Sequence, residues 1–139
     1  MAAQIWGVSQ AEYMEKADVW PLNPRGEIML GLKIEDKYGF ANVAEMLKVP
    51  GVAFGEGGPG DMGLSFGFKQ GDPKAKEVQD KIFAVAKAQH IYWLGIGGGG
   101  PGGNREAAIE ATIKEGRMVG SGEDTAAIGR KITKRPMPY

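Results

Sequence analysis

The chain has 139 residues, no cysteine, and 17 Lys and Arg against 17 Asp and Glu. This balance gives no long-range field toward nucleic acid or an anionic membrane, so we expect neither as a partner. Without cysteine, disulfides, thiolate zinc sites and cysteine nucleophiles are excluded, and any metal must use oxygen or imidazole ligands. No apolar stretch approaches ~18 residues and no signal-peptide pattern is present, which predicts a soluble, cytoplasmic protein.

Residues 1–27 are expected to form a lead-in segment with one short helix at 9–17. Ser9 followed by Glu12 has the spacing of a capping box, and the prolines that follow the helix end it. Beyond this segment, short apolar runs alternate with amphipathic helical patterns. Such alternation predicts consecutive βα units around a parallel sheet.

Four βα units are predicted over residues 28–133, and two prolines favour an extended tail at 134–139. The strands are expected at 28–34, 51–56, 90–96 and 118–120. The helices are expected at 39–48, at 73–89 with Asp72 as cap, from Asn104 to a stop at Gly116, and at 123–133. The positions expected to face the core are Val43, Met46, Leu47, Val78, Ile82, Val85, Ala86, Ile109, Thr112, Ile113, Ala127, Ile128 and Ile132.

The predicted fold class is therefore α/β, with four consecutive βα units that resemble half of a TIM (β/α)8 barrel. A complete barrel usually needs ~250 residues. An open half exposes strand edges and a large apolar face. We expect a second chain, self-association, or the remainder of a longer natural protein to complete it.

Two carboxylates follow the first two predicted strands. Glu35 and Asp61 lie one βα repeat apart, and the carboxyl ends of neighbouring strands share the rim where βα proteins place their active sites. Their oxygens can converge on Mg²⁺ or Mn²⁺, and other divalent ions fit the same ligands. The alternative is that both are ordinary solvated carboxylates at strand ends.

Two glycine-rich segments are candidates for anion binding. Residues 55–63 hold five glycines, which lets backbone N–H groups form an anion nest; the alternative is a wide turn. Residues 97–104 resemble a phosphate cradle that Arg105 could assist, but they lack the Gly-Lys-Ser/Thr ending of a P-loop, which favours a simple rim loop. His90 is predicted to begin the third strand at the opposite end, so we expect no histidine base at the site.

Several segments resemble the HpcH/HpaI aldolase/citrate lyase family. They are residues 31–36 (GLKIED), 42–47 (NVAEML), 49–52 (VPGV) and 58–65 (GPGDMGLS), and the resemblance extends over residues 26 to 133. The matching part is the C-terminal half of the family's sequences. The family consists of class II, metal-dependent aldolases on a modified βα barrel, which cleave 4-hydroxy-2-oxo acids into pyruvate and an aldehyde.

The resemblance implies roles for four residues. Glu35 and Asp61 match the two metal ligands, and the backbone amides of Gly60 and Asp61 match those that hold the pyruvate carboxylate. The metal would be Mg²⁺ or Mn²⁺ and would stabilise the pyruvate enolate. Lys33 stands where many members carry Gln, so we expect it to alter contacts to the metal or the substrate.

The family's remaining catalytic groups are an Arg that polarises the keto oxygen and a His with an acidic partner. Both belong to the N-terminal half, outside these 139 residues, so the catalytic residues are unknown here. We expect an aldolase-like carbon–carbon lyase that needs another chain or the missing half, as a homo-oligomer or with a complementary half-barrel chain. The alternatives are a noncatalytic half-barrel binding or assembly protein and a glycine-loop phosphate binder.

Overall fold

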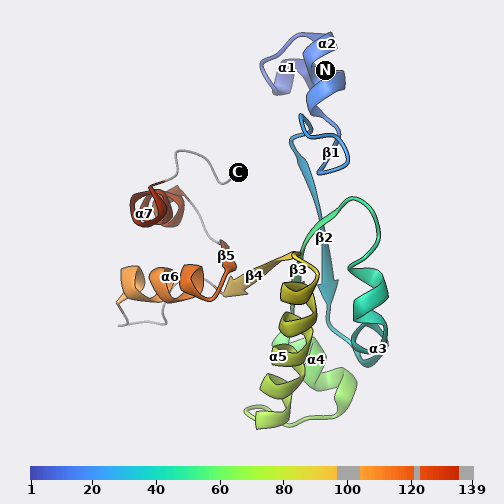
Figure 1. Ribbon diagram of the computed structural model, residues 1–139, viewed down its shortest axis with the longest axis vertical. Coiled ribbons are helices and arrows are strands. Elements are labelled where there is room, and N and C mark those ends of the chain that lie inside the picture. The colour runs from blue at the N-terminus through green and yellow to red at the C-terminus, as the bar shows by residue number, and fades with distance from the viewer. Residues whose placement is uncertain (97–103, 121–122, 135–139) are drawn as a thin grey trace. The chain divides into compact units, whose positions relative to one another are not determined.

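The computed structural model describes residues 1–96, 104–120 and 123–134. The chain divides into two compact units, Met1–Ile91 and Tyr92–Tyr139. Strands and helices alternate along both units, and the strands within each unit pair in parallel (Figure 1). The predicted α/β class is confirmed, and the succession of βα units is that of a partial TIM-barrel-like fold.

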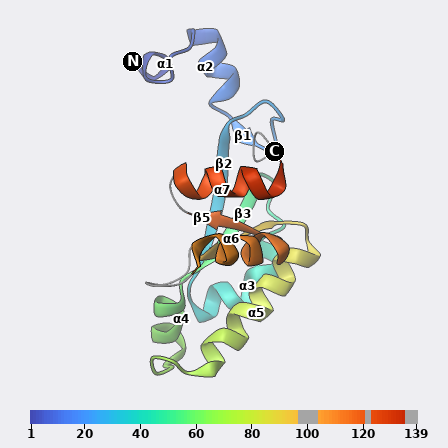
Figure 2. The same ribbon diagram turned by 90° about the vertical axis from the view of Figure 1, so that its left-hand side faces the viewer.

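The first unit is built around β2, which pairs in parallel with β1 and with β3. Helices α3, α4 and α5 pack against one another toward the carboxyl end of β2 (Figure 2). Its elements are α1 (Ala2–Ile5), α2 (Gln10–Lys16), β1 (Val19–Trp20), β2 (Ile28–Ile34), α3 (Lys37–Met46), β3 (Val52–Gly57), α4 (Pro59–Phe66) and α5 (Pro73–Ala88).

The core of the first unit lies between β2 and the helices. Each Ile or Leu that is fully withdrawn from water contributes roughly 1.5–3 kcal/mol, so a few such residues fix the packing of these short elements. The predicted strand 28–34 and the cap of α5 by Asp72 and Pro73 are confirmed. The buried apolar residues here are Ile34, Val43, Leu47, Val52, Ala53, Met62, Val78, Ile82 and Ala86.

The lead-in segment contains the predicted short helix. In α2 the Glu12 N–H donates to the Ser9 hydroxyl and the Ser9 N–H donates to the Glu12 carboxylate, so the capping box is confirmed. The segment is less irregular than expected, because it also holds α1 and a short strand. β1 pairs with the start of β2, joining Val19 to Ile28.

Two predictions for the first unit are wrong. The glycine-rich segment 55–63 is not a continuous loop, because α4 begins at Pro59 and ends at Phe66, followed by Gly67 as the C-cap with a φ of +71°. Proline suits the first turn of a helix, and burial of Met62 offsets the poor helix propensity of glycine. His90 does not begin a strand: its φ is +58°, it lies in the turn after α5, and β4 starts at Tyr92.

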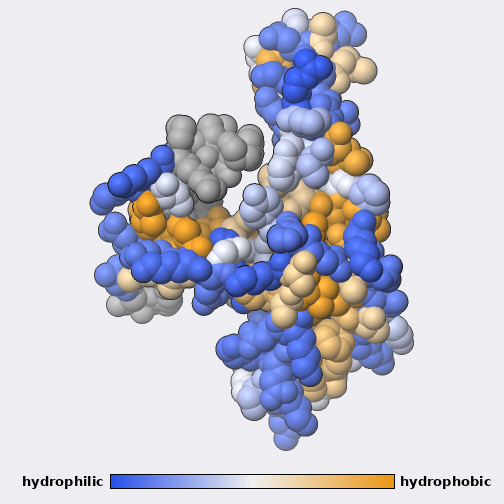
Figure 3. Space-filling model, viewed as in Figure 1, coloured by the Kyte–Doolittle hydropathy of each residue, from blue (hydrophilic) through white to orange (hydrophobic). Residues whose placement is uncertain are grey.

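The second unit consists of β4 (Tyr92–Ile96), α6 (Arg105–Lys114), β5 (Arg117–Gly120) and α7 (Glu123–Thr133). Asn104 caps α6 as predicted, through a hydrogen bond from the Ala107 N–H. Apolar side chains gather between α6 and α7 (Figure 3). The predicted inward position of Ala127 is wrong: that residue is exposed, whereas Thr125 on the same helix is buried and accepts a hydrogen bond from the Arg105 guanidinium.

Two sequence predictions fall on residues that are not described. The glycine-rich segment at 97–103 and the tail residues 135–139 lie outside the described residues. Among the helices that are described, none combines the length and the apolar character needed to cross a bilayer.

Candidate functional site

Lys33 and Glu35 lie at the carboxyl end of β2. Side chains alternate between the two faces of a strand, so these two share one face while Ile34 turns into the core. There Ile34 meets α3, where a Cβ added to Gly39 would be 3.4 Å from its Cγ2 atom. The apolar alternation of β2 therefore presents a lysine and a carboxylate together at the end of the strand.

Glu56 joins them from β3. The parallel register pairs Lys33 with Glu56, directly across the two strands. The Lys33 ammonium lies 2.7 Å from Glu35 Oε1 and 3.9 Å from Glu56 Oε1. Sequence reasoning missed Glu56 as a site residue, because its place beside Lys33 depends on the register of β2 against β3.

Asp61 approaches from the first turn of α4. The helix begins after Gly58, whose missing side chain leaves an open face toward both carboxylates. A Cβ at Gly58 would overlap Glu35 Oε1 and would lie 3.3 Å from Asp61 Oδ2. The structure thus brings the two carboxylates of the sequence prediction to one point.

The N-terminus of α4 presents free backbone donors beside this point. The Met62 N–H makes the first intrahelical bond, to the Gly58 carbonyl at 3.0 Å, and Pro59 has no N–H to offer. The amides of Gly60 and Asp61 precede that bond and belong to the helix end, where donors lack intrahelical acceptors and the dipole favours an anion. The glycine-rich segment therefore offers a helix terminus rather than a loop nest.

The electrostatics of the site are dominated by negative charge. The close polar contact and charge of Glu35, followed by the charges of Glu56 and Asp61, raise the pKa of Lys33, which is therefore cationic at neutral pH. Glu35 Oε1 is buried, and its contact with Lys33 is an ion pair by distance but not a well-directed hydrogen bond. One buried acceptor position on Glu35 is left without a hydrogen-bond donor.

The residues fit a hard divalent cation only in part. Within residues 1–96, 104–120 and 123–134, no three His, Cys, Asp or Glu side chains are arranged to hold a metal ion. The two converging carboxylates supply two of the six or so oxygens that Mg²⁺ prefers, and such sites commonly take the rest from water and substrate. The Lys33 ammonium already lies 2.7 Å from Glu35 Oε1, close to where a cation bound to Glu35 would lie.

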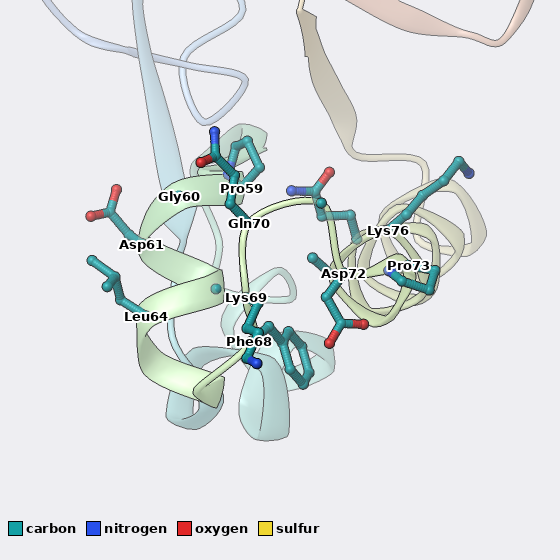
Figure 4. Close-up of a pocket in the computed structure, with 14 residues that line it drawn as sticks. Pro59, Gly60, Asp61, Leu64, Phe68, Lys69, Gln70, Asp72, Pro73 and Lys76 are labelled. Atoms are coloured by element: carbon teal, nitrogen blue, oxygen red, sulfur yellow. The ribbon is translucent and has the colours of Figure 1, made fainter.

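Hollows in the first unit lie on two sides of these carboxylates. A shallow one of about 370 Å³ is bounded by the end of β2 and by α3, and both Lys33 and Glu35 line it. A larger groove of about 880 Å³ lies between α4 and α5 (Figure 4). Gly60 and Asp61 also line this larger groove, although the Asp61 side chain points away from α5 in that view.

The sequence matches no protein-family model and no curated protein. Solved structures do resemble the chain. An HpcH/HpaI aldolase/citrate lyase family protein from Burkholderia cenocepacia matches with a TM-score of 0.62 and 19% identity over 96% of this chain and 48% of its own. Macrophomate synthase gives a TM-score of 0.57 at 19% identity, over 86% and 42%. Citrate synthase SbnG gives 0.56 at 20% identity, over 88% and 55%.

The chain is therefore an α/β protein with a partial TIM-barrel-like fold. The solved structures that it matches have the fold of the HpcH/HpaI aldolase/citrate lyase family, so the resemblance predicted from the sequence is confirmed at the level of the fold. The chain spans about half the length of the solved structures it matches.

Proposed function

We propose that this chain forms the cation-binding and oxo-acid-binding part of an aldolase-like carbon–carbon lyase. The observation that carries the proposal is the convergence of Glu35 and Asp61 on the open face of Gly58, beside a helix N-terminus. A carboxylate pair favours a hard cation and the adjacent amides favour an anion, and a 2-oxo acid chelated to a divalent ion needs both.

Each side chain then has a distinct task. Glu35 and Asp61 hold the cation, Mg²⁺ or Mn²⁺, which when bound supplies Lewis-acid polarisation of a keto oxygen. The amides of Gly60 and Asp61 orient the carboxylate of a small 2-oxo acid such as pyruvate. Lys33 contacts the substrate from the end of β2, where its flexible stem leaves the ammonium at the rim.

The groups that move protons are proposed to come from outside these residues. The chain spans about half of the solved structures with this fold, and the described site contains carboxylates and a lysine but no histidine. We propose that these proton-transfer groups are supplied either by a second copy of this chain or by a different chain that carries the complementary half-barrel.

The test of the cation site is Glu35→Gln, which preserves the shape of the side chain but removes its charge. We expect Mn²⁺ binding, measured by calorimetry or electron paramagnetic resonance, to weaken at least about tenfold, because one of two anionic ligands is lost. Asp61→Asn should weaken Mn²⁺ binding to a similar extent. Glu45→Gln is the matched control, since it removes the same charge from an exposed position on α3. Equal Mn²⁺ affinity in Glu35→Gln and Glu45→Gln would contradict the proposal.

A noncatalytic binding or assembly role is the second candidate, and one observation favours it. The Lys33–Glu35 ion pair neutralises part of the carboxylate charge without any metal. Under that role, 2-oxo acids and Mn²⁺ would leave the thermal midpoint of unfolding unchanged. Under the lyase proposal, Mn²⁺ with oxalate or pyruvate raises it by mass action.

A further inference from the structure

Lys33 lies among three carboxylates, and its position bears on how a cation reaches them. We propose that Lys33 is a built-in counter-ion that competes with a divalent cation for Glu35, and that Glu56 is the positioning residue that receives Lys33 when Glu35 is engaged. This inference rests on the proposed function, because it concerns the same carboxylate pair.

The competition follows from where the ammonium lies. Its 2.7 Å contact is with Oε1 of Glu35, the oxygen that fills the space beside Gly58, which Asp61 Oδ2 also borders. That atom is buried and has no hydrogen-bond donor of its own, so the lysine supplies its only close positive charge among the described residues. A divalent ion on the same oxygen would bring two cations into near contact, and the repulsion favours displacement of the lysine.

Glu56 offers a short route for that displacement. It is paired with Lys33 across the two strands, and its Oε1 already lies 3.9 Å from the ammonium. The Lys33 side chain is 54% exposed, against 31% for Glu56, so rotation of the lysine stem need not disturb the core. The move exchanges one ion pair for another, which costs less than leaving the carboxylate and the ammonium unpaired.

The remaining charges are consistent with this exchange. Glu35, Glu56 and Asp61 carry three negative charges against one positive charge on Lys33. When Glu35 and Asp61 hold a divalent ion, their two negative charges are balanced by that ion. Transfer of Lys33 to Glu56 then balances the remaining negative charge with the ammonium. Among the described residues, only Glu35 and Glu56 lie within ion-pair distance of the Lys33 ammonium, so without Glu56 the displaced lysine loses its nearest alternative carboxylate.

The test is a double-mutant cycle on Mn²⁺ affinity in the full chain, using Lys33→Gln, Glu56→Gln and the double variant. Lys33→Gln should tighten Mn²⁺ binding by about tenfold, because the competing charge is removed. Glu56→Gln should weaken binding about threefold to fivefold while Lys33 is present, and should have no effect in the Lys33→Gln background.

The cycle separates the exchange from plain electrostatics. If Glu56→Gln weakens Mn²⁺ binding equally in both backgrounds, Glu56 acts directly on the cation and the exchange is wrong. If Lys33→Gln binds Mn²⁺ no better than the unchanged chain, the competition is wrong. The proposed cation site itself fails only if Glu35→Gln leaves Mn²⁺ binding intact, a result that neither of the other two outcomes produces.

Discussion

At the scale of single residues, Gly58 decides whether Glu35 and Asp61 can meet. Its backbone is the N-cap of α4, and its φ of −95° is open to any residue, so glycine is not required there by backbone conformation. What glycine provides is space, because the Cβ of any other residue would overlap Glu35 Oε1. The identity of this residue is therefore tied to the carboxylate pair rather than to the turn.

Gly58→Ala is therefore expected to displace the Glu35 carboxylate and weaken Mn²⁺ binding about tenfold or more, with little effect on the unfolding midpoint. Gly63→Ala is the control, since a Cβ there has only an ordinary contact, 3.8 Å from the Phe68 carbonyl oxygen. Calorimetric titration of both variants checks the prediction. Undiminished Mn²⁺ affinity in Gly58→Ala would show that the carboxylates need not converge at this point.

The sequence was sufficient to pair Glu35 with Asp61 but not to include Glu56. Carboxylates that follow adjacent parallel strands reach one rim whatever the detailed register, so their proximity is a topological prediction. The position of Glu56 depends on the register itself, which shifts at an irregularity between Leu30 and Gly31. Such a shift arises from packing across the strands, where the Phe54 ring lies over Gly31, and is invisible to sequence periodicity.

At the scale of elements, the end of α5 carries a conformational cost. The Ile91 N–H donates to the Ala86 carbonyl and the His90 N–H to the Lys87 carbonyl, which is the Schellman arrangement. His90 occupies its left-handed position with a φ of +58°, where glycine is the usual residue. The equivalent position after α6 is occupied by Gly116, at +79°.

His90→Gly should consequently stabilise the chain by about 0.5–1 kcal/mol in denaturant unfolding. His90→Ala is the matched control: it also removes the imidazole but keeps a Cβ in the left-handed conformation, so no gain is expected. If both variants shift the unfolding midpoint equally, the effect comes from the imidazole and not from the backbone.

Helix α4 was not predicted from the sequence, whereas helix α5 was, and the two differ in the local signals that their residues carry. The sequence from Gly55 to Gly63 has the composition of a loop, and propensity alone argues against a helix. Burial of Met62 and packing against α3 and α5 reverse that preference. By contrast, α5 carries its own signals, an Asp-Pro start and an apolar stripe, and its start was predicted to the residue.

At the scale of the whole molecule, the first unit leaves apolar side chains uncovered where β2 begins. Leu30 is 43% exposed and Val49 is 53% exposed, and Figure 3 shows apolar residues at the surface of this unit. We define these two residues together with Leu22 and Ile28 as the apolar patch. Large apolar side chains that stay exposed in a folded unit are candidates for burial at a protein interface, in accord with the proposed second half-barrel.

The purified chain is accordingly expected to assemble, with a native mass larger than that of one chain by light scattering or native mass spectrometry. Leu30→Lys should lower that mass, because a charge in the apolar patch must be desolvated on association. Leu64→Lys is the control, as it places the same charge on α4 at a residue that is 82% exposed and outside the patch. A monomer at micromolar concentration, unchanged by Leu30→Lys, would mean that the patch does not mediate self-association, and a complementary chain would become the expected partner.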